Sequence, residues 1–261
     1  MKFILLFCFV HIARATITWQ FEKFLKDNYG DGVANMIKRS NLGKGGSFGG
    51  GNNRNVKNKP VILVHGITNT AGTFQKNRQF FLDHGYSDNE VYGTTYGDGG
   101  KTNVIFAVAA YTSSKVDIIS YSMGSPISRK AILGGACVDN GENLGGPLTG
   151  LVDTFVGVAG ANAGSFLCVF PFGSCNLVNG MICGSRYLND VNARTRYEGS
   201  NIFTVYSRND DKVGYQACGK LASVIQGQNG GFERNGKNHD QVMFDTINLQ
   251  YNLVKYEKEH P

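Results

Sequence analysis

The stretch Lys115–Leu133, KVDIISYSMGSPISRKAIL, constrains the fold more than any other part of the sequence. Its first segment, Val116–Ile119, is mostly apolar and rich in β-branched residues, which is typical of a strand buried on both faces. The run stops at Ser-Tyr-Ser-Met-Gly, and a segment with helical spacing follows that has Pro126 in its first turn, where a missing backbone N–H costs nothing. The stretch therefore predicts a buried strand, a sharp turn that holds Ser122, and a helix.

Ser122 is a candidate nucleophile because of this turn. A serine on a tight strand-to-helix turn is strained and exposes its hydroxyl, an arrangement known as a nucleophile elbow. Small residues two positions before and after the serine let strand and helix approach closely, and Gly124 meets this need. Ser120 stands where glycine is usual and is small enough to fit. The alternative is an ordinary serine in a loop, which the pattern Ser-x-Ser-x-Gly alone does not exclude.

The N-terminal residues have the pattern of a targeting segment. Lys2 precedes an apolar stretch, Phe3–Val10, and Ala-Arg-Ala offers a cleavage site after Ala15. The apolar stretch is too short to cross a bilayer, and no later stretch reaches that length without charges. We therefore expect residues 1–15 to be a signal peptide and residues 16–261 to form a single domain of a secreted protein without a transmembrane segment.

The charge balance argues against a nucleic-acid partner. Of the 26 Lys and Arg residues, two leave with the signal peptide. The remaining 24 exceed the 20 acidic residues by four and form no dense basic run. This mildly basic surface suits weak, peripheral contact with anionic lipid interfaces.

The cysteines indicate disulfides more than a metal site. Five remain after the signal peptide: Cys137, Cys168, Cys175, Cys183 and Cys218. In an oxidising compartment we expect two disulfides and one unpaired thiol, and spacing leaves the connectivity open, with Cys168–Cys175 a plausible short closure. After residue 15 the chain has no CxxC pattern and no cysteine close to a histidine, so we expect no metal and no other cofactor.

Apolar and helical segments alternate along the chain. Strands are predicted at Pro60–Val64, Glu90–Thr95, Val116–Ile119, Val152–Val158 and Ile202–Tyr206. Helices are predicted within Thr16–Leu42 and at Phe74–Phe81, Val104–Tyr111 and Val242–Val254, and Gln226–Asn238 is predicted to be a polar loop. This alternation predicts an α/β fold with a mostly parallel sheet and helices on both faces.

Residues 165–200 interrupt this alternation. They hold three of the five remaining cysteines and a cluster of apolar residues without clear periodicity: Phe166, Leu167, Val169, Phe170 and Phe172. We interpret this segment as an insertion at the carboxyl ends of the strands, where α/β sheets place their binding crevice. We expect it to line that site and to be held by at least one disulfide.

The histidines and acids that follow Ser122 complete a catalytic hypothesis. Acyl transfer by serine needs a base that takes its proton and an acid that orients the base, and in elbow-containing hydrolases the acid precedes the histidine. Only His239 and His260 follow Ser122, and His260 is penultimate and expected to be frayed, so His239 is the candidate base. Asp210 and Asp211 are the acids that directly follow a predicted strand.

Spacing favours Asp210 over its neighbour as the acid. Val213, the one apolar residue close behind, stands three positions after Asp210 and can anchor the turn in the core. Asp211 is next to Lys212 and suits a solvated charge that pairs with it. Asp190 and Glu198 are the next candidates.

Two backbone groups are expected to form an oxyanion hole, which stabilises the negative charge that develops on a carbonyl oxygen. They are the N–H of Met123, directly after the serine, and the N–H of Ile67, in the loop after the strand that ends at Val64. We expect Gly66 to permit the unusual backbone that aims the N–H of Ile67 inward.

Four segments carry a resemblance to a known family: VILVHGI, VDIISYSMGSPISRKAILGG, VDTFVGVAGAN and YSRNDDKVG. They resemble the triacylglycerol lipase class 2 family, in its branch of secreted nematode lipase-like proteins, and more distantly the small bacterial lidless lipases. The resemblance implies a minimal α/β-hydrolase fold and metal-free hydrolysis of carboxylic esters. Carried over by motif, it implies a triad of Ser122, Asp210 and His239, with Ile67 and Met123 as oxyanion donors.

Two classes of function fit these residues. The first is a secreted serine esterase or lipase, in which Ser122 attacks the ester carbonyl, His239 moves the proton and Asp210 orients His239. The second is a catalytically inactive hydrolase fold that binds lipid, while thioester or amide hydrolysis would use the same triad. We favour the ester hydrolase, because every required side chain is present, and expect a monomer that acts on lipid or small ester substrates.

Overall fold

The computed structural model describes residues 16–52, 54–96, 101–171 and 173–260. The predicted signal peptide at residues 1–15 and Phe172 of the predicted insertion lie outside these ranges.

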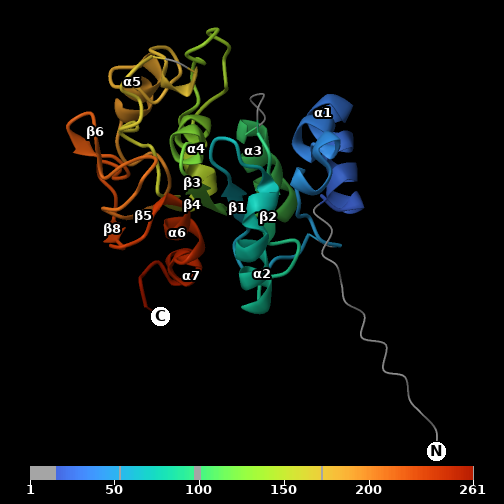
Figure 1. Ribbon diagram of the computed structural model, residues 1–261. Coiled ribbons are helices and arrows are strands. Elements are labelled where there is room, and N and C mark those ends of the chain that lie inside the picture. Colours follow the sequence, from blue (N-terminus) through green and yellow to red (C-terminus); the bar gives the residue numbers. More distant parts are fainter. Residues whose placement is uncertain (1–15, 53, 97–100, 172, 261) are drawn as a thin grey trace, which may run out of the picture.

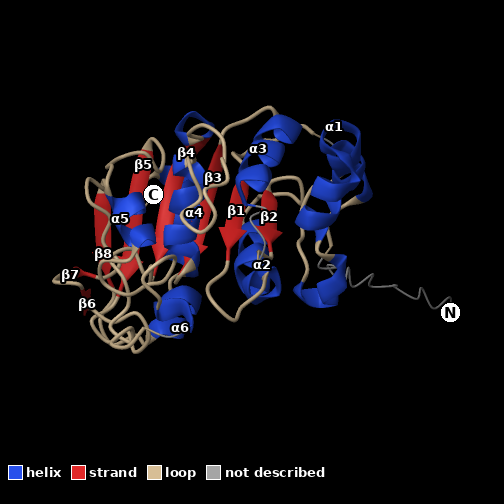
Figure 2. Ribbon diagram, turned by 90° about the horizontal axis from the view of Figure 1, so that it is seen from above, coloured by secondary structure: helices blue, strands red, loops and turns tan. Residues whose placement is uncertain are grey.

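The described residues contain one six-stranded sheet in the order β2-β1-β3-β4-β5-β8, in which every neighbouring pair is parallel. Its strands are β1 (Val61–Val64), β2 (Val91–Thr94), β3 (Val116–Tyr121), β4 (Val152–Val158), β5 (Asn201–Tyr206) and β8 (Gly230–Glu233). A short antiparallel hairpin, β6 (Gln216–Ala217) and β7 (Lys220–Leu221), lies outside the sheet at the end that carries β8 (Figure 2). The predicted α/β fold with a mostly parallel sheet is confirmed.

Helices cover both faces of the sheet, as predicted. They are α1 (Trp19–Lys38), α2 (Gln75–Asp83), α3 (Lys101–Thr112), α4 (Gly124–Leu133), α5 (Arg186–Asn192), α6 (His239–Phe244) and α7 (Ile247–Tyr256). Helices α1, α3 and α4 pack on one face, and α2, α6 and α7 pack on the other (Figure 1). Strand β1 serves both cores, because Ile62 and Val64 belong to the first and Val61 and Leu63 to the second.

Two predicted segments differ from the structure. The predicted polar loop Gln226–Asn238 contains β8, which pairs in parallel with β5 from Phe203↔Gly230 to Tyr206↔Glu233. This edge strand is only partly buried and begins with two glycines, so it lacks the apolar run that reveals an internal strand. Its identification as a loop was therefore wrong.

The predicted single helix Val242–Val254 is two helices, α6 and α7. The hydroxyl of Thr246 donates to the carbonyl oxygen of Val242 at 2.6 Å, and this side-chain bond accompanies the break between the helices. Helix α6 also begins earlier than predicted, at His239, because the side chain of Asn238 caps it by accepting from the backbone N–H of Gln241. The cap fixes the backbone of His239 at the start of a helix.

Candidate active site

Ser122 lies on the tight turn between β3 and α4 and has a left-handed backbone, with φ at 55°. Such a conformation costs a residue with a side chain about 1–2 kcal/mol. Backbone hydrogen bonds hold it from both sides: Ser122 N–H donates to Val158 O at 2.9 Å, and Ser122 O accepts from Ala161 N–H at 3.2 Å. The strain predicted for the turn is present, and the end of β4 maintains it.

Two glycines let the end of β1 approach this turn. A Cβ on Gly124 would lie 2.3 Å from the carbonyl oxygen of His65, and a Cβ on Gly66 would lie 2.7 Å from Cβ of Ser122. Gly66 is not among the described residues with positive φ, so the expectation of an unusual backbone there was wrong. Space beside the serine, and not conformational freedom, is what requires glycine. Ser120 is fully buried, so its side chain fits where glycine is usual.

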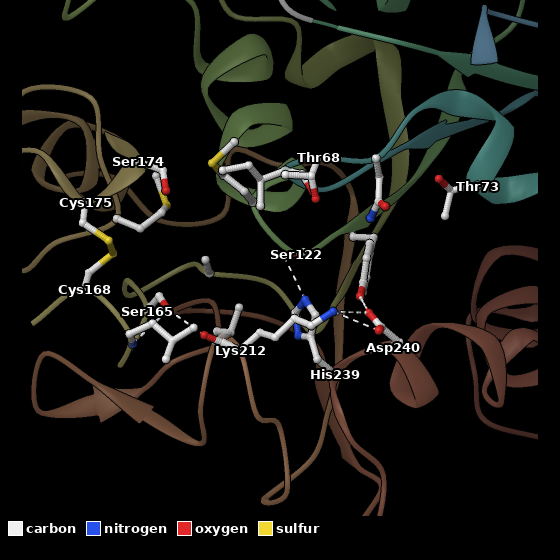
Figure 3. Close-up of a pocket in the computed structure, with 18 of the residues that line it drawn as sticks. Thr68, Thr73, Ser122, Ser165, Cys168, Ser174, Cys175, Lys212, His239 and Asp240 are labelled. Carbon is white, nitrogen blue, oxygen red and sulfur yellow. Dashed lines mark hydrogen bonds and ion pairs between the residues drawn. A yellow bond between two sulfur atoms is a disulfide. The ribbon is translucent and has the colours of Figure 1, made fainter. Parts of the chain in front are cut away.

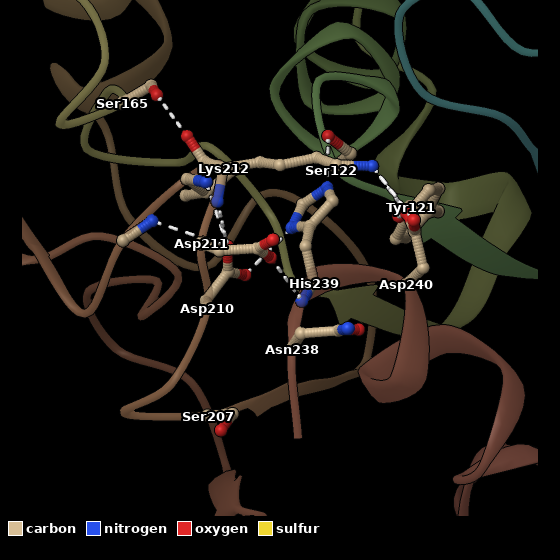
Figure 4. A network of polar contacts seen from close by, with 12 residues as sticks. Tyr121, Ser122, Ser165, Ser207, Asp210, Asp211, Lys212, Asn238, His239 and Asp240 are labelled. Carbon is tan, nitrogen blue, oxygen red and sulfur yellow. Dashed lines mark hydrogen bonds and ion pairs between the residues drawn. The ribbon is translucent and has the colours of Figure 1, made fainter. Parts of the chain in front are cut away.

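Three side chains predicted from the sequence meet at the carboxyl edge of the sheet (Figure 4). His239 Nε2 lies 2.9 Å from Ser122 Oγ, and His239 Nδ1 lies 2.8 Å from Asp210 Oδ2. Ser122 follows β3, Asp210 follows β5 and His239 begins α6, and all three are buried. A carboxylate at Nδ1 keeps the proton on that nitrogen, so Nε2 is free to accept from the serine hydroxyl.

The second oxygen of Asp210 is held by the backbone. Its Oδ1 accepts from the N–H groups of Lys212 at 3.0 Å, Val213 at 2.8 Å and Gly214 at 3.3 Å. Val213 is buried, in agreement with the expectation that it anchors the turn. These bonds fix Oδ2 toward the histidine ring.

Asp211 is exposed, as expected, but it has a different partner. Its Oδ1 accepts from the backbone N–H of His239 at 2.9 Å, and this bond lowers the pKa of Asp211. The expected pair between Asp211 and Lys212 was wrong, because Lys212 Nζ lies 2.9 Å from both carboxylate oxygens of Asp240. The two neighbouring acids thus hold the ring and the backbone of the same histidine.

The other candidate acids belong to the scaffold. Glu198 is fully buried and pairs with Arg129, whose Nε lies 2.8 Å from Glu198 Oε1. Asp190 pairs with Lys130 at 2.7 Å. Neither contacts His239 among the described contacts.

His65 fixes the peptide group that carries the predicted oxyanion donor of Ile67. Its Nδ1 donates to the Gly66 carbonyl at 2.7 Å, while Nε2 accepts from the backbone N–H of Tyr96 at 3.1 Å. Because this peptide is trans, the N–H of Ile67 points away from that carbonyl. The sequence interpretation passed over His65, although its place directly after β1 was a signal.

A pocket of about 430 Å³ contains the serine (Figure 3). Its lining includes both residues predicted to supply oxyanion donors and six residues of the predicted insertion. The lining residues are Ile67, Thr68, Asn69, Thr73, Tyr121, Ser122, Met123, Ala161, Ser165, Leu167, Cys168, Ser174, Cys175, Met181, Lys212, Val213, His239, Asp240 and Phe244. The expectation that the insertion lines the site is confirmed for this pocket.

Disulfides hold the insertion. Cys168 pairs with Cys175 within it, as predicted, and Cys183 ties it to Cys218 between β6 and β7. Of the cysteines that the structure describes, Cys137 is the one outside a disulfide.

A second polar group borders the pocket and was not identified from the sequence. The hydroxyl of Tyr121, the residue before Ser122, donates to Asp240 Oδ1 at 2.7 Å. The Tyr121 ring lies 4.9 Å from the His239 ring, between centroids. Burial raises the pKa of Tyr121, and the hydrogen bond from Lys212 lowers the pKa of Asp240. Asp240 is therefore a carboxylate held by a neutral phenol and an ammonium group.

The described residues offer neither a metal site nor a membrane span. They contain no cluster of three or more His, Cys, Asp or Glu side chains placed to bind a metal ion. None of the described helices is long and apolar enough to cross a membrane.

Three solved structures that superpose on this chain are described as lipases. Aspergillus fumigatus lipase B superposes with a TM-score of 0.55 and 18% identity over 78% of this chain and 53% of that one. The propeptide form of a Bacillus licheniformis lipase superposes with a TM-score of 0.61 and 13% identity over 83% of this chain and 55% of that one. The mature form of the same lipase superposes with a TM-score of 0.56 and 13% identity over 81% of this chain and 98% of that one.

This chain thus spans about half the length of the first two structures and nearly all of the mature Bacillus enzyme. At identities this low, the superposition shows a shared fold and nothing more. No curated protein sequence matches the chain significantly. The model of the class 2 lipase family matches residues 58–252, which is more than half of the chain. The chain therefore belongs to the class 2 lipase family, and its fold is the α/β-hydrolase fold that it shares with these lipases.

Proposed function

We propose that this protein is a secreted serine hydrolase that cleaves carboxylic esters, lipid acyl esters above all, through a covalent intermediate on Ser122. The observation that carries the proposal is the single imidazole of His239, which lies within hydrogen-bond distance of both Ser122 Oγ and Asp210 Oδ2. Its second support is membership of the class 2 lipase family.

In the proposed reaction, Ser122 Oγ attacks the ester carbonyl while His239 Nε2 takes its proton. Asp210 keeps the ring oriented and stabilises the imidazolium that forms. The backbone N–H groups of Ile67 and Met123 donate to the tetrahedral oxyanion. His239 then gives the proton to the leaving alcohol, and water repeats the sequence to release the acid and free Ser122.

The rim of the pocket favours lipid substrates. The insertion that lines part of the pocket exposes large apolar side chains: Phe166, Leu167, Val169, Phe170, Leu177 and Val178. Of these, Leu167 lines the pocket itself. Ile67, on the loop with the proposed oxyanion donor, is 44% exposed. Apolar residues gathered near an acyl-binding pocket suit peripheral contact with a lipid surface. Secretion is supported by the two disulfides, which persist in oxidising compartments.

The test joins covalent labelling with substrate profiling. A fluorophosphonate should modify Ser122 in the mature protein, and p-nitrophenyl esters of increasing acyl length should reveal the preferred chain. Labelling and ester hydrolysis that both disappear in Ser122→Ala would support the proposal. A folded protein that binds lipid, takes no label and hydrolyses no ester would instead be an inactive lipid-binding member of the family.

A further inference from the structure

We propose that Lys212 determines acyl specificity: its side chain, paired with Asp240, forms a movable charged wall of the pocket that disfavours long acyl groups. The inference rests on the proposed ester hydrolysis at Ser122 and concerns residues that have no role in the proposed triad or oxyanion hole. It comes from the way in which Lys212 spans the pocket.

The backbone of Lys212 is fixed at the pocket edge. Its N–H donates to Asp210 Oδ1 at 3.0 Å, and its carbonyl accepts from the hydroxyl of Ser165 at 2.8 Å, at the start of the insertion. From there the side chain runs past Ser122 and His239 to Asp240, in both close-up views (Figures 3 and 4). Lys212 and Asp240 both line the pocket.

The two ends of the pair differ in mobility. Asp240 directly follows His239 and accepts from the buried hydroxyl of Tyr121, so its carboxylate has a second, fixed partner. The side chain of Lys212 is 50% exposed and that of Asp240 52%. An ion pair this exposed contributes little to stability, and a lysine has a flexible stem. Lys212 can therefore leave Asp240 while Asp240 stays in place.

Binding a long acyl chain here has an electrostatic free-energy cost that binding a short one does not have. A short acyl group beside Ser122 leaves the Lys212–Asp240 pair in water. A long apolar chain must either displace the lysine or cover the pair and strip water from two charges, which is unfavourable. Removing the charge while keeping the length of the stem should therefore favour long chains.

The experiment compares kcat/KM for p-nitrophenyl laurate and p-nitrophenyl butyrate in Lys212→Met, Asp240→Asn and the double variant. We expect the laurate-to-butyrate ratio to rise about threefold or more in each single variant. The double variant should show no further rise, because both changes remove the same pair. Salt at about 1 M should raise the ratio more in the wild type than in Lys212→Met.

Lys237→Met is the matched control. Lys237 also forms an ion pair with a residue close to α6, Asp245, at 2.9 Å, but neither residue lines the pocket. Its ratio should equal that of the wild type. The inference is overturned if the laurate-to-butyrate ratio falls, or rises by less than about threefold, in Lys212→Met and Asp240→Asn. If fluorophosphonate still labels Ser122 in these variants, the proposed function is not affected by that result. A wild type without labelling or butyrate hydrolysis would remove the proposed function and this inference with it.

Discussion

The elbow and the insertion border the same pocket, but different forces hold them. The elbow, from β3 to α4, consists of buried backbone: Ser122 keeps a strained φ because β4 bonds to it and because Gly66 and Gly124 let β1 approach. The insertion has one short α-helix, α5, and exposed apolar side chains, and two disulfides tie it down. One wall is shaped by packing and the other by covalent links.

The two regions therefore suit different tasks: the elbow suits the reaction, and the insertion suits the binding of different acyl chains. The proposed nucleophile and oxyanion donors need positions fixed to a fraction of an ångström, which a close-packed sheet edge provides. A wall that receives acyl chains needs apolar surface more than regular structure. Changes at the elbow should therefore alter the rate of the reaction, and changes at the insertion should alter stability and substrate range.

The largest effect is expected at the elbow itself. Ser122→Ala should lower ester hydrolysis by roughly 10⁶-fold, as loss of the nucleophile does in a well-studied serine protease, because the members of a triad act as a unit. The variant should unfold at the wild-type temperature or above it, since only a hydroxyl is removed from a strained turn. Retention of a tenth of wild-type activity would contradict the role of Ser122.

The next effect distinguishes the two neighbouring acids. Asp210→Asn should lower kcat by about 10⁴-fold, because an amide at Nδ1 favours the wrong tautomer of His239. Asp211→Asn should stay near wild-type activity, since an amide oxygen can still accept from the backbone N–H of His239. Equal, mild losses in both variants would show that the acid lies elsewhere.

Removal of the disulfides tests how the insertion is held. In the chain-entropy account, the loop of sequence separation 35 closed by Cys183–Cys218 is worth about 4 kcal/mol, and that of separation 7 closed by Cys168–Cys175 about 2.5 kcal/mol. Paired Cys→Ser variants should lose stability to urea in that order. Butyrate hydrolysis at low temperature should fall far less than in the elbow variants. A loss of activity as large as that of Asp210→Asn would mean that the insertion also positions the triad.

The smallest effect concerns the buried start of β3, where Asp117 is 1% exposed. Burial raises its pKa to about 7, although its carboxylate accepts from the backbone N–H of Thr154. A raised pKa in an acid means that the unfolded chain ionises first, so stability falls as pH rises from about 4 to 7. Asp117→Asn removes this penalty, and its stability advantage should grow by about 2 kcal/mol from pH 5 to pH 7.

Urea titrations of both proteins at the two pH values measure this advantage. An advantage that does not change between them would show that Asp117 is ionised in the folded protein. Reductant should leave the difference unchanged, because Asp117 lies outside the insertion that the disulfides hold.

Several elements were readable from the sequence because their signals are local. The continuous apolar runs of β1, β3, β4 and β5 follow from burial on both faces, and His239 was found because few histidines follow Ser122. Edge strand β8 was missed because half-exposed glycines carry no such signal. The break between α6 and α7 was missed because Thr246 fits a helix pattern and its bond to Val242 is invisible in the sequence.

The sequence by itself determined the strand, turn and helix around Ser122, the α/β class of the fold and a short set of candidate acids. Spacing already favoured Asp210 among them, and Asp210 does hold the ring of His239. Only the tertiary structure decided that Asp211 holds the backbone of His239 and that Lys212 crosses the pocket to Asp240. Burial and turn geometry leave periodic patterns in neighbouring residues. Contacts across 28, 29 and 117 residues do not, because the order and register of parallel strands bring their loops together.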